Sequence, residues 1–345
     1  MRITTNAILR NYKSNLGTSL RNLDTTRTRV MTQRKFNSTA EDPSSALRAA
    51  ILERKYAKNE DYLNTVKDVQ SFQDSQEDAA MQIETIAKRL SKQYGLEALN
   101  GTNGSLETRQ TYADAWRGAQ ESLVLSLNAS YEGKYVFAGG DGKNPPFKLV
   151  TKDDGTQVLT YRGLDVNDTS AANKAALDKL SKESIFVDLG FGLNVDVDAT
   201  NNRDINIDSS SAFNTSLPGI NLAGYGKDDN GMTNNIVLLC GEIADVLSDP
   251  NFDRDRYQEL LNKFDEGRNN VLQNVTILGT QTEFLSTTKD RLETSSINLS
   301  TQIDNVVNVD MAEAIMDFSW AQYAYNAALK VGNNILTPSF IDFMR

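Results

Sequence analysis

The residues with the clearest capacity for chemistry are four aspartates close together in the middle of the chain: Asp196, Asp198, Asp204 and Asp208. Carboxylates that alternate in this way can bind Ca²⁺ through their oxygens. A calcium loop of the EF-hand type that began at Asp196 would need glycine at its sixth position and glutamate at its twelfth, but Asn201 and Ile207 stand there. We therefore interpret the cluster as the solvent-exposed face of a β-strand, in which Asp alternates with Val.

Other reactive groups are few. The sequence has no histidine and one cysteine, Cys240, which follows an apolar run and is predicted to be a buried, unreactive thiol. Chemistry that needs an imidazole or a disulfide framework is thereby excluded. The segments 190–192 and 224–226 each hold two glycines but lack the third glycine of a dinucleotide loop, so we predict turns there. We expect no enzyme activity, no cofactor and no metal site.

Charge restricts the class of partner. The formal net charge of −10 disfavours a nucleic-acid partner. Residues 1–40 nevertheless carry a strong basic bias, with one acidic residue, Asp24, against Arg2, Arg10, Lys13, Arg21, Arg27, Arg29, Arg34 and Lys35. A removable transit peptide can have this composition. We favour pairing with the other end of the chain instead, because acidic residues, including Asp310, Glu313 and Asp317, outnumber basic ones in residues 304–345.

The elements that must position these charges are predominantly helical. Apolar residues recur at seven-residue intervals at Leu9, Leu16, Leu23 and Val30, which predicts a helix with a narrow apolar seam. The polar residues Ser19 and Thr26 weaken that seam, so we expect this helix to be poorly ordered until a partner covers it. No run of eighteen apolar residues occurs, and we expect no membrane-spanning segment.

A second helix is predicted to begin at Pro43, with Asp42 as its N-cap, and to end near Asn100. A third runs from Leu106 to a point before Gly133, and the two should fold back on each other. The strongest periodic signal lies in the C-terminal third, where a strict seven-residue spacing predicts a left-handed coiled coil. It comprises Tyr257, Phe264, Val271, Leu278, Leu285, Leu292, Leu299 and Val306.

The middle of the chain differs in amino-acid composition from both ends. Residues 141–230 are rich in Gly, Asn, Asp, Ser and Thr, and we predict a β-rich insertion there. A hairpin should pair residues 147–151 with 157–161 around Asp154 and Gly155. Further strands are predicted at 185–187, 193–197 and 205–207, with a short helix at 173–180.

The expected fold is therefore mainly α, a long antiparallel helical bundle or coiled coil built from both termini, with a central β domain. Its predicted segments are a terminal helix at 1–42, a helical rod at 43–140 and 231–305, the insertion at 141–230, and a second terminal helix at 306–345. Beyond Val306 the apolar face becomes unusually wide, which indicates burial by other subunits.

Local motifs add a resemblance to a known family. An ordered set of short segments is similar to the flagellin family of bacterial flagellar axial proteins. The segments are 1–5, 40–44, 132–140 with Pro146–Phe147, 270–272 with 278–281, 309–310, 327–331 and 339–340. The likeness covers both helical ends, about two thirds of the chain. It is closest to the hook-associated members of the family, although residues 310–314 are also close to the flagellin ending.

The resemblance implies a structural subunit that joins hook and filament through coaxial packing of its terminal helices, which are disordered in the monomer. The implied partners are hook-associated protein 1, flagellin, further copies of the chain in a ring, and a cytoplasmic export chaperone. The implied location is the extracellular flagellum, reached unfolded through the flagellar type III apparatus. The expected assembly contacts are Leu9, Leu16, Leu23, Val30, Met311, Ile315, Phe318, Tyr325, Leu329 and Leu336.

Two alternatives remain. The chain could be flagellin itself, the filament subunit. It could also be a peripheral membrane or adaptor coiled coil that places its basic N-terminal helix on anionic lipid, although that helix lacks the aromatic-rich apolar face that such helices use.

Overall fold

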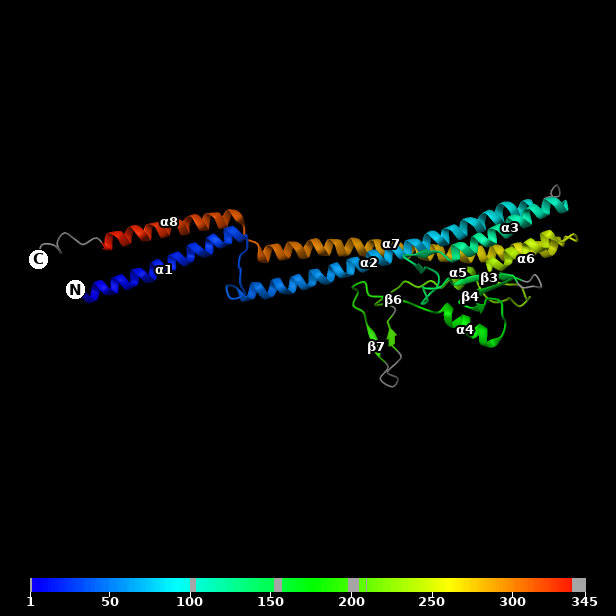
Figure 1. The fold of residues 1–345 in the computed structure, drawn as a ribbon, viewed down its shortest axis with the longest axis horizontal. Helices are drawn as coiled ribbons and strands as arrows, with labels where there is room; N and C mark the ends of the chain where they lie inside the picture. Colours follow the sequence, from blue (N-terminus) through cyan, green and yellow to red (C-terminus); the bar gives the residue numbers. More distant parts are fainter. Residues whose placement is uncertain (1, 100–103, 152–156, 198–204, 209, 337–345) are drawn as a thin grey trace. The chain divides into compact units, whose positions relative to one another are not determined.

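The computed structural model describes residues 2–99, 104–151, 157–197, 205–208 and 210–336. It divides into two compact units, which we name the terminal unit (Met1–Asp61 and Leu292–Arg345) and the central unit (Tyr62–Arg291). Two long helices, α2 (Pro43–Arg89) and α7 (Arg254–Val307), contribute residues to both units (Figure 1). The main prediction, a mainly helical chain with long helices from both ends, is confirmed.

The predicted seven-residue seam forms the buried side of α7. In the central unit its residues Tyr257, Phe264, Val271, Leu278 and Leu285 are at most 1% exposed. Burial of side chains of this size contributes about 1.5–3 kcal/mol each. The facing residues of α2 follow the same alternation and include Val66, Ala80, Ile83 and Ala87, all 0% exposed.

Polar side chains fix the alignment of α2 and α7 in the central unit. Gln73 Nε2 donates to Gln281 Oε1 at 2.7 Å, and Arg268 lies 3.6 Å from the Glu84 carboxylate. The residue numbers fall along one helix as they rise along the other, so the two helices are antiparallel. Because the glutamine pair lies within the seam, a shift of either helix would leave its buried amide groups without partners.

The start of α2 follows the prediction, because Asp42 Oδ1 accepts from the Ser45 N–H at 3.0 Å. Hydrogen bonds from the side chain and the backbone of Ser45 lower the pKa of the Asp42 carboxyl group. The helical backbone of α2 also ends near the predicted point: the α-helix runs to Arg89, a π-helix, η1 (Leu90–Gly95), follows, and helix continues to Glu97. The π-helical stretch itself was not predicted. Contacts from α7 accompany this change, since Tyr257 Oη donates to the Gly95 carbonyl at 3.1 Å.

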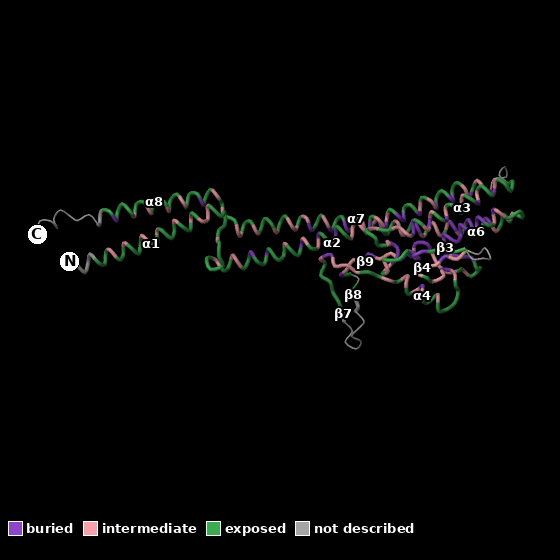
Figure 2. Tube along the Cα trace, viewed as in Figure 1, coloured by how far each residue is buried: buried purple, intermediate pink, exposed green. Residues whose placement is uncertain are grey.

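The third helix, α3 (Leu106–Leu127), begins at Leu106 and ends before Gly133, both as predicted. It packs closely on α6 (Ile236–Ser248), and Trp116 of α3 meets Phe264 of α7 edge to face at 4.9 Å between ring centroids. Cys240 of α6 is buried, as predicted, and desolvation raises the pKa of its thiol, which disfavours the reactive thiolate form. Figure 2 shows the buried residues gathered in this part of the central unit.

Short strands and helices fill the insertion. The predicted hairpin is confirmed: β3 (Phe147–Thr151) pairs with β4 (Gln157–Tyr161), Phe147 opposite Tyr161, and β5 (Leu164–Asp165) extends the antiparallel sheet. The Asp154–Gly155 turn lies outside the described residues. The remaining elements are β1 (Ser130–Tyr131), β2 (Lys134–Tyr135), α4 (Ala171–Ser181), β6 (Phe186–Val187), β7 (Val195–Val197), β8 (Ile205–Ile207), β9 (Phe213–Asn214) and α5 (Gly219–Ala223).

Of the four aspartates, Asp196 lies on β7, which pairs antiparallel with β8 and places Asp196 opposite Asn206, and Asp208 directly follows β8. The predicted strands at 193–197 and 205–207 are thus confirmed, the first two residues shorter at its start. Asp198 and Asp204 lie outside the described residues. At Asp208, hydrogen bonds from the backbone and hydroxyl of Ser210 lower the pKa of the carboxyl group.

Candidate assembly interface

The terminal unit pairs the two ends of the chain. Helix α1 (Arg2–Thr32) lies along helix α8 (Met311–Leu336). The α8 residues that face α1 follow a strict 3-4 spacing, which we name the intrachain seam: Met311, Ala314, Phe318, Ala321, Tyr325, Ala328 and Gly332. Alanine and glycine recur in it, so the two backbones can approach closely.

One contact sets the spacing between the helices near the end of the pair. Tyr12 Oη donates to the Ala328 carbonyl at 3.1 Å. A Cβ atom built on Gly332 would lie 1.9 Å from that Tyr12 oxygen. No side chain larger than a hydrogen atom therefore fits at position 332 while Tyr12 keeps its place.

The linkers beside these helices are joined by a short antiparallel bridge between Arg34 and Asn308, which we name the linker clasp. The Lys35 N–H donates to the Val307 carbonyl at 2.8 Å, and the Val309 N–H donates to the Gln33 carbonyl at 3.0 Å. The linker after α1 and the linker before α8 are thus held side by side at one end of the α1–α8 pair. The clasp fixes the axial alignment of α1 with α8 by backbone hydrogen bonds, independently of the seam.

The predicted charge pairing between the ends takes an indirect form. Arg29 and Lys35 line a pocket of about 180 Å³ together with Glu313 and Asp317. No ion pair within 4.0 Å joins α1 to α8 among the residues whose side chains are described. Opposite charges therefore surround one cavity without direct contact, and charge pairing as the reason for the match of the ends stays a prediction.

The ten predicted assembly residues divide into three sets. The first set is half-buried in the contact between α1 and α8 of one chain: Leu9, Leu16, Leu23, Val30, Met311, Phe318 and Tyr325. The second set, Ile315 and Leu329, is 50% and 43% exposed and lies beside the seam. The third is Leu336, which ends α8 and whose side chain lies outside the described residues.

Sequence reasoning missed a further set on α8. Met316, Trp320, Tyr323 and Val331 are 58%, 71%, 70% and 52% exposed. The Trp320 and Tyr323 rings meet edge to face at 6.4 Å and, with Ile315, border an open depression of about 540 Å³. The available signal was their spacing of four and three residues, which repeats the seam pattern on another side of the helix.

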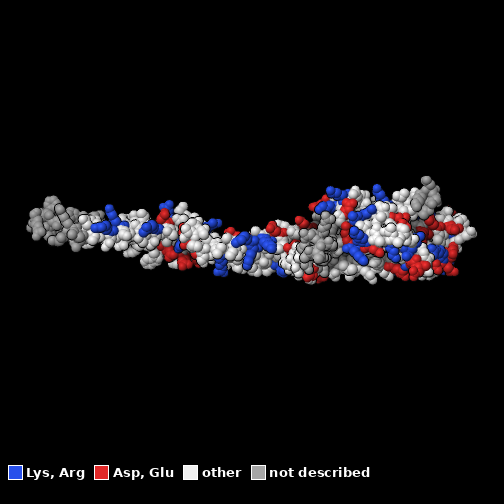
Figure 3. All heavy atoms as spheres, turned by 90° about the horizontal axis from the view of Figure 1, so that it is seen from below, with Lys and Arg blue, Asp and Glu red and all other residues white. Residues whose placement is uncertain are grey.

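Charge is scattered over the terminal unit. On the face drawn in Figure 3, separate basic and acidic side chains stand on a surface that is otherwise uncharged. Burial is shallow as well, since only Ala314 and Gly332 are fully buried among the residues of α1 and α8 whose side chains are described (Figure 2). Such a helix pair offers surface for further helices.

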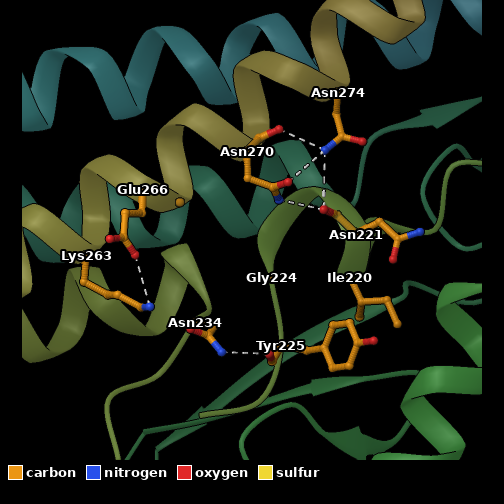
Figure 4. Close-up of a pocket in the computed structure, with 10 residues that line it drawn as sticks. Ile220, Asn221, Gly224, Tyr225, Asn234, Lys263, Glu266, Asn270 and Asn274 are labelled. Carbon is orange, nitrogen blue, oxygen red and sulfur yellow. Dashed lines mark hydrogen bonds and ion pairs between the residues drawn. The ribbon is translucent and has the colours of Figure 1, made fainter. Parts of the chain in front are cut away.

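The central unit contains a groove of about 500 Å³ between α5 and α7, drawn in Figure 4. Its asparagines hold the backbone in place: Asn270 Nδ2 donates to the Asn221 carbonyl at 2.8 Å, and Asn221 Nδ2 donates to the Ser181 carbonyl at 2.7 Å. Lys263 lies 3.5 Å from the Asp228 carboxylate. Because these donors already have acceptors within the protein, we assign the groove a structural role.

The described residues contain no group of three or more acidic or cysteine side chains placed to hold a metal ion. None of their helices combines the length and apolarity that a membrane crossing requires.

Comparisons with known proteins agree with this architecture. Residues 3–141 match the family model described as the bacterial flagellin N-terminal helical region. Curated proteins give no match.

Among solved structures, a putative flagellar hook-associated protein from Vibrio parahaemolyticus is 15% identical, covering 78% of this chain and 100% of that one, with a TM-score of 0.55. FlgL from Bacillus cereus is 16% identical, covering 74% and 99%, with a TM-score of 0.51. A structure described as the flagellar junction protein FlgL from Legionella pneumophila is 15% identical, covering 70% and 99%, with a TM-score of 0.44.

The resemblance inferred from sequence motifs is thus confirmed: residues 3–141 match the model of the bacterial flagellin N-terminal helical region, and the chain shares its fold with a putative flagellar hook-associated protein.

Proposed function

We propose that this chain is a structural subunit of the bacterial flagellum that forms the junction between hook and filament, the role of flagellar hook-associated protein 3. The observation that carries the proposal is the terminal unit. There α1 and α8 pair through a half-buried seam and leave large apolar side chains exposed, including Trp320 at 71%. A subunit that completes its burial against neighbours requires such a surface.

The comparisons support the flagellar assignment in the same region. The family model covers α1, α2 and α3. The fold likeness to a hook-associated protein extends over 78% of the chain. We infer that the terminal helices pack coaxially in a ring of copies, with hook-associated protein 1 on one side and flagellin on the other.

The route to that position is part of the proposal. Export through the flagellar type III apparatus requires an unfolded chain, and the chain contains no disulfide that would oppose unfolding, since its only cysteine is Cys240. A cytoplasmic chaperone would cover the apolar face of α8 before export. The chain acts structurally and performs no catalysis.

Deletion of the gene in its native bacterium tests the proposal. The expected result is loss of filaments with flagellin released into the medium, because a junction subunit is needed to retain flagellin on the hook. Complementation with the intact gene is the control and should restore filaments. Retained filaments would contradict the proposal, and loss of filaments without released flagellin would favour the alternative that the chain is flagellin itself.

A further inference from the structure

Helix α8 carries two apolar faces. One is the intrachain seam against α1. The second, which we name the outer stripe, consists of residues spaced by four, three, four and four: Met316, Trp320, Tyr323, Ala327 and Val331. At 3.6 residues per turn these positions share one side of the helix, roughly opposite the seam.

The outer stripe has the composition of a binding surface. All five residues are exposed, and its two aromatic residues are the most exposed, Trp320 at 71% and Tyr323 at 70%. Trp and Tyr are the side chains that most often dominate the energy of protein interfaces. The depression of about 540 Å³ beside them could receive an apolar side chain from a partner.

Helix α1 carries a complementary surface on one flank. Lys13, Leu20 and Arg27 stand at seven-residue intervals, so they share a side of the helix, and all three are exposed. We name this set the basic stripe. Within the described part of the chain, neither Lys13 nor Arg27 forms an ion pair, and Leu20 is 50% exposed.

We propose that the outer stripe of one copy docks on the basic stripe of α1 in a second copy. This inference rests on the proposed structural function and adds the faces through which copies meet. Leu20 supplies an apolar anchor for the aromatic rings, and the Arg27 guanidinium supplies a positive charge. Glu313 and Asp317, which are exposed beside the outer stripe, supply the opposite charge.

The chain's own helix pair provides an alignment for the contact. In it Tyr12 meets Ala328, and the linker clasp joins Gln33 to Val309. A second copy's α1 in the same antiparallel register would bring Leu20 opposite Trp320 and Arg27 opposite Glu313. Apolar and charged groups would then each face a suitable partner.

Charge favours this arrangement over the contact of two outer stripes. A parallel contact of α8 with α8 would bring the acidic residues Glu313 and Asp317 of both copies together, and a parallel or antiparallel contact would leave both basic stripes uncovered. A contact of α8 with α1 uses different surfaces on the two partners. It can therefore repeat from copy to copy and build a ring or a helical array.

Site-directed cross-linking of the full-length chain tests the proposal. Ser319→Cys lies beside the outer stripe and Gly17→Cys lies beside the basic stripe, where a new Cβ meets no atom within 4 Å, while the native Cys240 is buried and does not compete. The two variants are purified separately, mixed at high concentration in ammonium sulfate, which strengthens apolar burial, and treated with a short bismaleimide. The expected product is a cross-linked dimer in the mixture and little in either variant alone.

The matched control is Asn22→Cys, an exposed position on another side of α1, which should give little dimer with Ser319→Cys. Dimers from Ser319→Cys alone would indicate α8 against α8 and overturn the proposal, as would equal cross-linking through Asn22→Cys. A chain that associates in sedimentation without the predicted cross-link, or that stays monomeric throughout, also overturns it. The proposed function is judged separately, by the filaments of the deletion strain.

A charge variant tests the chemistry of the same contact. Arg27→Gln should weaken association of the full-length chain by about 1.5- to five-fold, the range of an exposed ion pair. Arg21→Gln removes the same charge from another side of α1 and should leave association nearly unchanged. Equal effects of the two variants in sedimentation velocity would show that net charge alone is responsible and would overturn the role given to Arg27.

Discussion

Gly332 holds a position in α8 where the two terminal helices come closest. Its Cα faces the Tyr12 hydroxyl group, which is bonded to the Ala328 carbonyl one turn earlier along α8. Glycine costs about 1 kcal/mol relative to alanine in a helix interior. Close approach of Tyr12 is the physical reason for its use here.

Gly332→Ala should therefore loosen the α1–α8 pair although it raises the intrinsic helix propensity of α8. The new methyl group must displace Tyr12 and break its hydrogen bond, at a cost of about 0.5–1.5 kcal/mol. Hydrogen exchange of α8 amides should become faster. Gly17→Ala, where the new Cβ meets no atom within 4 Å, is the matched control and should slow exchange in α1. The prediction fails if Gly332→Ala slows exchange as much as the control does.

The sequence predicted which side of a terminal helix is covered where that helix carries a single stripe of apolar residues. The line through Leu9, Leu16 and Leu23 identified the buried side of α1 because no competing apolar line exists on that helix. On α8 two stripes have similar spacing. Periodicity cannot tell which stripe the chain's own α1 covers, so Trp320 and Tyr323 were not among the predicted contacts.

One of the polar contacts that join α2 to α7 is a pair of glutamine side chains in a mainly apolar seam. Gln73 is 1% exposed and bonds Gln281 at 2.7 Å. A buried polar pair of this kind specifies register at a cost in stability. Replacement of both glutamines by apolar residues should therefore raise the stability of the helix pair and weaken the specification of its register.

Gln281→Leu alone should destabilise the central unit by about 1–3 kcal/mol, because the buried Gln73 amide loses its acceptor. The double variant with Gln73→Leu should recover this loss and melt at or above the temperature of the parent protein. Thermal unfolding followed by circular dichroism measures both. Gln273→Leu, at an exposed position on α7, should change the melting temperature little. A double variant less stable than Gln281→Leu would contradict the interpretation.

At the level of elements, the bounds of the helices were predicted better than the type of helix within them. Asp42 and Pro43 are local signals for the start of α2, and the structure uses both. The π-helix at its end has no comparable signal. A Cβ on Gly95 would lie 2.6 Å from a Leu261 methyl carbon, so this segment is shaped by contacts with α7 that sequence alone does not reveal.

The two units differ in how completely their residues are buried. The central unit contains the fully buried large side chains, including Trp116, Tyr257 and Phe264. In the terminal helices only Ala314 and Gly332, among residues with described side chains, reach full burial. Stability should therefore be unequal along the chain.

Limited proteolysis of the dilute full-length protein should trim roughly the first 40 and last 40 residues and leave a resistant core. The reason is the shallow burial of α1 and α8, which lowers the free energy needed to open them. Mass spectrometry of the fragments identifies the boundaries. The same digestion of concentrated protein in ammonium sulfate is the control, and there the ends should be protected. Protection of both ends in dilute protein would refute the prediction that they are disordered in the monomer.

The contact of Tyr12 with Ala328 joins residues separated by 316 positions, against 208 for the Gln73–Gln281 pair. A contact of such high sequence separation forms late, because the entropy of closing so large a loop must be offset by contacts already made. A ribosome delivers α1 first and α8 last. Throughout that interval the α1 seam has no partner in its own chain, so synthesis itself leaves a period in which a binding protein or another copy's α8 can reach it.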